Sequence, residues 1–258
     1  MITIKNKASI RKMEEAGRRL SSIFTELKTI VIAGMSTQQI DQIIEEKLRK
    51  LSLVSKSKGY CGYKHVSCIS VNDVVVHGVP SEKDILKKGD LVTVDVCASW
   101  KGYCADMARS WFVESNGSSN KAKELVAVAY SALDKGIEKA VVGNRLSDIS
   151  FAIQKEVESY GYGVVRDFAG HGIGKFMHED PEILNYGKPG KGPILRPGMT
   201  FAIEPMITMG DYSVYIDSDG WTAKTKDGSL AAHVEDTIVI TEGKPKILTR
   251  NCLNGEVN

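Results

Sequence analysis

Two stretches of this 258-residue chain repeat each other at a fixed distance. Residues 86–95 (LKKGDLVTVD) align with residues 195–204 (LRPGMTFAIE), 109 positions later, so that Asp95 falls on Glu204. The same offset relates two helical regions, in which Gly34, Ile40 and Ile44 match Gly143, Ile149 and Ile153. Two matches at one offset predict two diverged copies of one structural unit. Because no linker is long enough to separate domains, we expect a single domain over 1–258, with related halves at about 10–112 and 119–249.

The first copy ends in a strand that carries an acidic residue. Residues 91–97 alternate, with three valines on one face and Asp95 on the other. A tight turn is expected at 100–102, and Asp95 and Asp106 are equidistant from the point between residues 100 and 101. A hairpin would then set the two carboxylates opposite each other. Like charges at a cross-strand pair are destabilising unless they share a proton or a cation.

The second copy supplies two more acids. Glu204 corresponds to Asp95, and Glu235 lies in HVEDTIVIT, whose alternation again predicts a strand. Four acids on four strands, with histidine and without a cysteine cluster, form an oxygen-rich ligand set that suits Mn, Fe(II) or Co better than a structural zinc. Four acids exceed the needs of one divalent ion, whereas two ions roughly 3.5–4 Å apart would use them all. The pattern therefore predicts a dinuclear hydrolase.

Composition excludes several other classes. A hydrophobic content of 42% suffices for a core, and a net charge of +2 with mixed signs gives no nucleic-acid or membrane surface. The start of the chain lacks a signal-peptide apolar core, and no run approaches the ~20 apolar residues of a membrane span. The cysteines are odd in number and form no Cys-x-x-Cys pair, so we expect reduced thiols in a cytoplasmic protein. They are Cys61, Cys68, Cys97, Cys104 and Cys252.

Apolar periodicity predicts four helices, at about 10–31, 40–51, 121–140 and 148–160. Ser36 to Gln39 resembles a capping box ahead of the second helix. His77 follows a short apolar strand, and His171 and His178 lie among glycines that let the backbone approach a ligand. Asp227-Gly228 is a hairpin signal between the last strands.

Five motifs in this order resemble type I methionine aminopeptidases of peptidase family M24, from about residue 10 to 249. They are VNDVVVHGVP, the Asp95 and Asp106 pair, GHGIGKFMHED, LRPGMTFAIEP and HVEDTIVIT. The resemblance implies an α+β pita-bread fold, with two pseudo-symmetric halves around a dinuclear metal site. It implies removal of the initiator methionine from nascent proteins, after deformylation, when the second residue is small and uncharged. The length resembles the short bacterial form, which lacks a zinc-binding extension.

The resemblance also implies roles for individual residues. Asp95 would chelate one ion, Asp106 and Glu235 would bridge two, and His171 with Glu204 would complete the second. Glu204 would also move a proton. His77 and His178 would contact the substrate amide and the tetrahedral intermediate, with a structural role as the alternative. Tyr60, Tyr63, Cys68, Met177 and Trp221 would line the methionine pocket, with ordinary core packing as the alternative for Tyr63, Cys68 and Trp221.

Three positions depart from the usual pattern of these enzymes. Met107 follows Asp106 where Thr or Ser is usual, Met177 stands where an aromatic residue is common, and Cys61 stands where histidine is frequent. These departures bear on pocket shape and on the hydrogen bonds around Asp106. The ions would be two of Co, Mn, Fe(II) or Zn, because sites of this kind accept several metals.

The partners implied are the N-termini of nascent polypeptides, which the enzyme, as a monomer, could meet at the ribosome. Two alternatives keep the fold. An X-Pro peptidase would keep the metal ligands, but the roughly 80 residues before His77 leave little room for the extra N-terminal domain usual in such enzymes. A non-catalytic binding relative would have lost a ligand, and all five ligands are present.

Overall fold

The computed structural model describes residues 1–114 and 119–250. Residues 115–118, which lie between the two predicted halves, and Cys252 lie outside these ranges. The helices are α1 (Lys7–Ile30), α2 (Thr37–Lys50), α3 (Asn120–Lys139) and α4 (Leu146–Ser159), with a short 3₁₀ turn at Tyr60–Gly62. In the first half the strands are β1 (Val54–Ser55), β2 (Cys68–Val71), β3 (Val74–Val76), β4 (Leu91–Trp100) and β5 (Tyr103–Phe112). In the second half they are β6 (Gly163–Val164), β7 (Gly170–Gly172), β8 (Glu179–Ile183), β9 (Thr200–Ile203), β10 (Met206–Thr208), β11 (Val214–Ile216), β12 (Ala223–Thr225), β13 (Ala231–His233), β14 (Glu235–Val239) and β15 (Lys246–Ile247).

All four predicted helices are present, and local chemistry sets where they begin. Asn6 caps α1 by accepting a hydrogen bond from the Ser9 backbone N–H, so this helix starts three residues before the predicted position. Ser36 and Gln39 form the predicted capping box of α2. No helix within 1–114 and 119–250 has the length and apolar character needed to cross a membrane.

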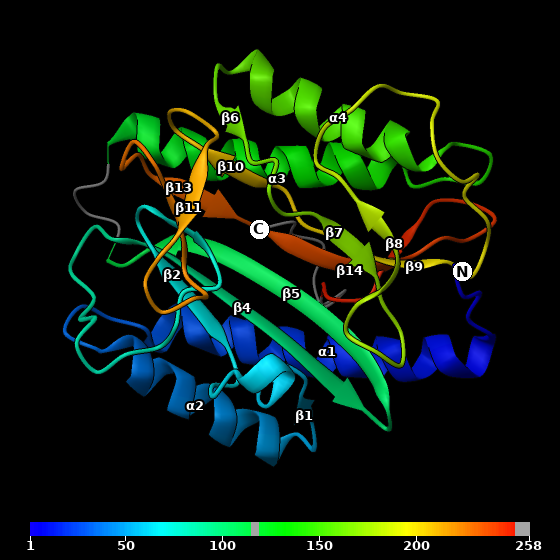
Figure 1. The fold of residues 1–258 in the computed structure, drawn as a ribbon. Coiled ribbons are helices and arrows are strands. Elements are labelled where there is room, and N and C mark those ends of the chain that lie inside the picture. Colours follow the sequence, from blue (N-terminus) through cyan, green and yellow to red (C-terminus); the bar gives the residue numbers. More distant parts are fainter. Residues whose placement is uncertain (115–118, 251–258) are drawn as a thin grey trace.

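The 109-residue offset recurs in the structure. Helices α2 and α4 begin at 37 and 146 and end at 50 and 159, and strands β4 and β9 begin at 91 and 200. An isolated bridge joins Ser36 to Ile85 in one half, and the same bridge joins Arg145 to Ile194 in the other. In Figure 1 the blue pair α1 and α2 lies on one side of the view and the green pair α3 and α4 on the other, with the strands between them.

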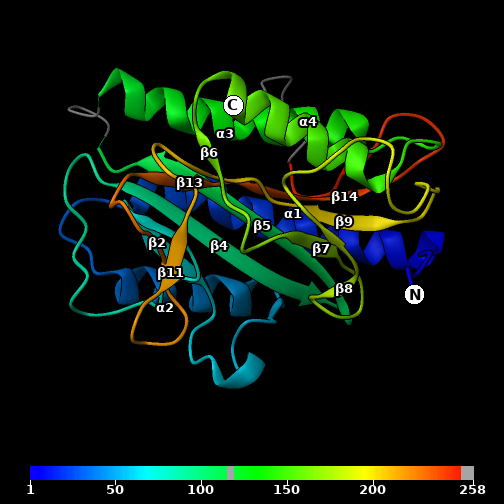
Figure 2. The same ribbon diagram turned by 45° about the horizontal axis from the view of Figure 1, so that its top comes forward.

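One large sheet connects the two halves. Its strand order is β1-β4-β5-β14-β9-β7-β8, with β2 also pairing β4 and β15 pairing β14. Strands β5 of the first half and β14 of the second are antiparallel neighbours at the junction. Each helix pair covers mainly the strands of its own half with a buried apolar cluster. Figure 2 shows α3 and α4 side by side along the same side of these strands.

The β4–β5 hairpin differs from the predicted register by two positions. Lys101 and Gly102 form the turn with φ values of 48° and 79°, as a two-residue type I′ turn requires. Consequently Asp95 pairs with Ala108, and Asp106 pairs with Cys97. The expected direct pairing of Asp95 with Asp106 is wrong, because the turn is centred one residue later than the sequence suggested. The two acids remain on the same face as diagonal neighbours.

Two further expectations about strands are corrected. Asp227-Gly228 forms a turn, but β12 before it pairs with β11 and β3, whereas β13 after it pairs with β10, so the turn closes no hairpin. Glu204 does not lie in a strand but follows the last residue of β9. Both strands around Asp227 are only three residues long, and their partners come from distant parts of the chain.

Candidate metal centre

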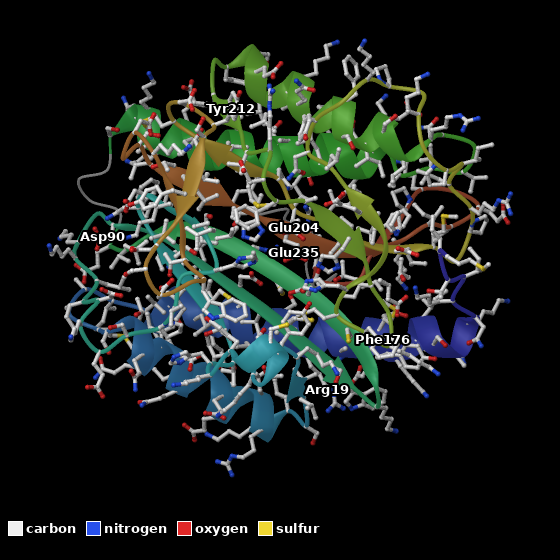
Figure 3. The ribbon with its side chains drawn as sticks, viewed as in Figure 1. Arg19, Asp90, Phe176, Glu204, Tyr212 and Glu235 are labelled. Carbon is white, nitrogen blue, oxygen red and sulfur yellow. The ribbon has the colours of Figure 1, made fainter. Side chains whose placement is uncertain are left out.

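A cavity of about 610 Å³ opens between the two halves. Every residue that the sequence suggested for a site lines it. These are the five possible ligands Asp95, Asp106, His171, Glu204 and Glu235, the histidines His77 and His178, and the pocket residues Tyr60, Tyr63, Cys68, Met177 and Trp221. Figure 3 shows Glu204 and Glu235 close together at the centre of the molecule, between the two helix pairs.

Sheet register brings three of the acids together. Asp95 on β4 and Glu235 on β14 both pair with Ala108 of β5, one from each side. Asp106 lies two residues from Ala108 on the same strand, so its side chain emerges on the same face. The small Ala108 side chain leaves room between them. Three carboxylates from three adjacent strands therefore face one point of the cavity.

His171 and Glu204 come from neighbouring strands of the second half. His171 pairs with Ala202, and its Nε2 lies 3.5 Å from Glu204 Oε1 and 3.9 Å from Asp106 Oδ2. Its Nδ1 lies 2.9 Å from the Gly172 carbonyl oxygen, which fits an N–H donor there and leaves the Nε2 lone pair toward the carboxylates. A ring nitrogen of His171 and oxygens of Asp106 and Glu235 all lie within 4.8 Å of one another.

The glycines beside His171 serve packing against neighbouring strands. A Cβ at Gly170 would lie 2.5 Å from the Ala202 carbonyl oxygen, and one at Gly172 would lie 2.0 Å from the Asp180 carbonyl oxygen. These glycines therefore let β7 approach β9 and β8, whereas the sequence suggested an approach to a ligand. Their role is to hold the His171 backbone close to Glu204.

The acids of the cluster resist ionisation in the absence of a cation. Burial, and next the Glu204 carboxylate, raise the pKa of Asp106 to about 7. Burial raises the pKa of Glu204 to about 8. Burial and neighbouring carboxylates also raise the pKa of Asp95 and of Glu235. Burial lowers the pKa of His171 to about 4, which favours the neutral imidazole that binds metals.

The donor set fits divalent cations. Asp106 Oδ1 and Glu235 Oε1 are buried without a hydrogen-bond partner in the described part of the chain. Buried polar atoms are normally paired, so oxygens of this kind call for a ligand. Four carboxylates and one neutral imidazole supply enough donors for two ions bridged by carboxylates.

The two remaining predicted histidines lie on the cavity wall. His77 follows β3 with a φ of 59° and packs edge-on against Phe168, with ring centroids 5.2 Å apart. His178 Nδ1 lies 3.1 Å from the Tyr60 hydroxyl, and its ring meets His171 edge-on at 4.5 Å. The left-handed backbone at His77 is uncommon for a residue other than glycine, and such conformations cluster at functional sites.

The predicted pocket residues form an aromatic and sulfur-bearing wall. Tyr63 and Trp221 pack with ring centroids 5.0 Å apart, and the Tyr63 hydroxyl donates to the Ser67 carbonyl oxygen at 2.9 Å. Cys68 pairs with Asp95 across β2 and β4. This wall therefore adjoins the acid cluster directly.

The three departures in sequence lie in different environments. Met107 is buried in the core behind the sheet, and Thr237 makes the hydrogen bonds to the Asp106 backbone at 2.8 Å. Met177 lines the cavity, and Cys61 is exposed on the 3₁₀ turn. The four described cysteines are free thiols, as expected.

The cavity is also lined by residues that the sequence analysis did not single out, among them Phe168, Met206 and His233. His233 is the informative case, because it stands two positions before Glu235. An alternating segment puts residues two apart on one face, so this spacing could have indicated it. Phe168 and Met206 carry no such signal.

Comparison with known proteins identifies the family. The model of metallopeptidase family M24 matches residues 11–242. Methionine aminopeptidase from Clostridium acetobutylicum is 46% identical over 249 residues, 96% of this chain and 99% of the relative. The chain belongs to the methionine aminopeptidases of family M24. Methionine aminopeptidase 1 from Bacillus subtilis is 43% identical, over 97% of this chain and 100% of that relative.

Solved structures of family M24 agree with this assignment. The crystal structure of methionine aminopeptidase from Thermotoga maritima matches with a TM-score of 0.95 and 44% identity, over 97% of this chain and 100% of that one. Prolidase from Pyrococcus furiosus matches with a TM-score of 0.76 and 24% identity, and only 65% of that chain is covered. The prolidase likeness shows the pita-bread fold alone, so the X-Pro alternative is not favoured.

Proposed function

We propose that this protein is a metal-dependent aminopeptidase that removes methionine from the free N-terminus of polypeptides. The observation that carries the proposal is the convergence of five donor side chains on one cavity wall, two of which have buried oxygens with no hydrogen-bond partner among the described residues. This wall belongs to a chain that is 46% identical to a methionine aminopeptidase over almost its whole length. Two divalent cations per chain, each Co, Mn, Fe(II) or Zn, would use the full donor set.

Bound cations would polarise the scissile carbonyl and supply a nucleophilic water at neutral pH. We assign Asp95 to one ion, Asp106 and Glu235 to both, and His171 with Glu204 to the other. Glu204 also takes a proton from the attacking water and returns it to the leaving amine, because its carboxylate lines the cavity beside the other ligands.

The remaining residues orient the substrate. His77 and His178 supply positioned donors for the peptide amide and for negative charge that develops on the carbonyl oxygen. Tyr60, Tyr63, Cys68, Met177 and Trp221 hold the methionine side chain, since aromatic and sulfur groups pack well against a thioether. A small, uncharged second residue fits this arrangement, as the resemblance to the family implies.

The substrates are the N-termini of nascent polypeptides, and the amine must be free because the carboxylate cluster attracts a cationic group. Removal of an N-formyl group must therefore come first. We further propose that the enzyme acts as a monomer in the cytoplasm, meeting its substrates at the ribosome.

A peptide assay tests the proposal. Chelator-treated protein is supplied with Mn, Fe(II), Co or Zn, and release of methionine from Met-Ala-Ser, formyl-Met-Ala-Ser and an X-Pro dipeptide is measured in parallel. We expect metal-dependent cleavage of the unformylated peptide only. Cleavage of the X-Pro dipeptide alone would replace the proposed substrate, and no hydrolysis with any metal would favour the non-catalytic relative.

A further inference from the structure

The proposed ligand set leaves one histidine of the cavity without a role. His233 is the last residue of β13, and its side chain lines the cavity while the residue is only 1% exposed. The sheet fixes its backbone, since His233 pairs with Met206 and its N–H donates to Ser110 Oγ at 3.2 Å. Its ring is therefore held at the site by the fold itself.

The Nε2 atom of His233 has no hydrogen-bond partner in the described part of the chain. The carboxylate near it is Glu204, whose Oε2 lies 3.5 Å away. The other oxygen of the same carboxylate, Oε1, lies 3.5 Å from His171 Nε2. The Glu204 carboxylate thus lies between two imidazole nitrogens, one beside each oxygen.

Among the described residues, three of the buried side-chain atoms without a hydrogen-bond partner belong to this one cavity: Asp106 Oδ1, Glu235 Oε1 and His233 Nε2. Leaving a buried polar atom unpaired destabilises the fold, so three in one place are not expected by accident. A cation supplies the partner for the two oxygens, and the same cation chemistry accepts a nitrogen lone pair.

We propose that His233 Nε2 is a sixth protein ligand of the metal centre, which then carries two imidazoles, one on each side of Glu204. This inference rests on the proposed dinuclear function. Imidazole suits Co, Fe(II) and Zn better than it suits Mn, which prefers oxygen. A second imidazole therefore shifts the preference of the centre toward Co, Fe(II) and Zn.

Proton NMR of the Co(II)-loaded protein counts the coordinated histidines. Each imidazole bound through Nε2 gives a paramagnetically shifted N–H signal that disappears in D₂O. We expect two such signals in the wild type and one in His233→Gln. His171→Gln should also show one, and His77→Gln should show two. His77 is the matched control because it lies in the same cavity and, within the described residues, has no carboxylate within 4.0 Å of its ring nitrogens.

Metal affinity gives a second readout that does not depend on activity. Calorimetric titration should show that His233→Gln binds Co(II) and Zn(II) at least roughly tenfold more weakly than the wild type does. Loss of a residue that only supports a ligand already lowers metal affinity by this factor. Mn(II) binding should weaken less. Circular dichroism checks that the variant is folded.

The outcomes separate the inference from the proposed function. If the wild type binds two Co(II) ions but shows one shifted N–H signal that His233→Gln keeps, the sixth-ligand assignment is overturned and the dinuclear function stands. Equal affinities of wild type and His233→Gln for Co(II) would overturn it as well. If the wild type binds no divalent cation, the proposed function fails together with the inference.

Discussion

The carboxylate of Glu204 has two proposed roles. It is a proposed ligand, and it is the proposed carrier of the proton. Its position after β9, rather than in the strand, lets it face two imidazoles at once. Substitutions at this residue therefore test the chemistry most directly.

Glu204→Gln should lower kcat by about 10²–10⁴ at saturating metal, because the amide keeps the size of the side chain but cannot accept the proton. Steady-state cleavage of Met-Ala-Ser measures this. Met107→Leu is the matched control, since Met107 packs in the core behind the site. It should cost less than about 1.5 kcal/mol of stability and leave activity unchanged. Wild-type turnover in Glu204→Gln would remove the proton-carrying role.

The raised pKa values of the acids predict how the metal-free protein responds to pH. A carboxyl whose pKa is raised on folding adds stability that is fully present below its ordinary pKa and is lost as the pH rises through its folded pKa. For Asp106 and Glu204 this window runs from 3.8 and 4.5 to about 7 and about 8. The buried histidines have lowered pKa values and oppose this trend up to about pH 6.5, so the melting temperature of chelator-treated protein should fall as the pH is raised from about 6.5 to about 8.

Divalent cations should change that response. Saturating Mn(II) or Co(II) replaces the protons of the cluster, so the decline in melting temperature between about pH 6.5 and about pH 8 becomes smaller. Scanning fluorimetry across pH, with and without metal, measures both curves. A melting temperature of the metal-free protein that rises over this range would contradict the assigned cause. Asp106 and Glu204 were recognised in the sequence, whereas His233 was overlooked although it stands two positions before Glu235 in an alternating segment.

Among the elements, β7 is one of the short strands on which the site depends. It is three residues long, and glycines flank His171 on both sides. The close approach of its backbone to β9 sets the distance from His171 to Glu204.

Gly170→Ala should separate β7 from β9, because the added Cβ would lie 2.5 Å from the Ala202 carbonyl oxygen. Overpacking of this kind costs typically about 1–3 kcal/mol, and we expect weaker metal binding as well. Urea unfolding and metal titration measure the two effects. Gly243→Ala is the control, since an added Cβ there meets no atom within 4 Å. Equal metal affinity in both variants would show that β7 tolerates the displacement.

Helices and strands with strong local sequence signals were predictable, but the register and the partners of the strands were not. The four helices follow from apolar periodicity, and the capping box of α2 sets its start. The register of β4 and β5 depends on whether Trp100 or Lys101 begins the turn, and that depends on which residues adopt positive φ. The partners of β12 and β13 come from distant segments, which no local pattern at Asp227-Gly228 specifies.

At the scale of the whole molecule, the first residues of the chain hold the second half in place. Lys5 donates from its backbone N–H to the Gly198 carbonyl oxygen, and its ammonium pairs with Glu179 at 2.7 Å. Glu179 in turn accepts the Lys175 and Phe176 backbone N–H groups. This pair therefore supports the loop that carries Met177 and His178.

Lys5→Met should lower the free energy of unfolding by about 1.5–3 kcal/mol, because the Glu179 carboxylate loses its cationic partner while it keeps the hydrogen bonds from Lys175 and Phe176. The side chains of this pair are 6% and 11% exposed. KM for the peptide should rise too, since the loop loses its support. Lys246→Met is the control: its pair with Glu14 is about half exposed and should contribute less than about 1 kcal/mol. Urea unfolding decides between a strong and a weak contribution.

The two-half architecture was predictable from the repeat, because duplicated units keep their turn residues. Gly34 and Gly143 both have φ of 90°, and Gly89 and Gly198 have 86° and 85°. The sequence could not indicate which faces the halves present to each other. That arrangement follows from the pairing of β5 with β14, a contact between strands more than a hundred residues apart.

The correspondence of Asp95 with Glu204 bears on how such a site could have arisen. A twofold-symmetric dimer presents the same residue twice at its axis. In the present chain α2 corresponds to α4, and β4 corresponds to β9. Two half-length chains related in the same way would already bring one acid from each subunit into a shared interface. In a single fused chain, each of the two acids can change independently of the other. The Glu204 side chain is one methylene longer than that of Asp95. The imidazoles of His171 and His233 lie beside Glu204, the longer of the two.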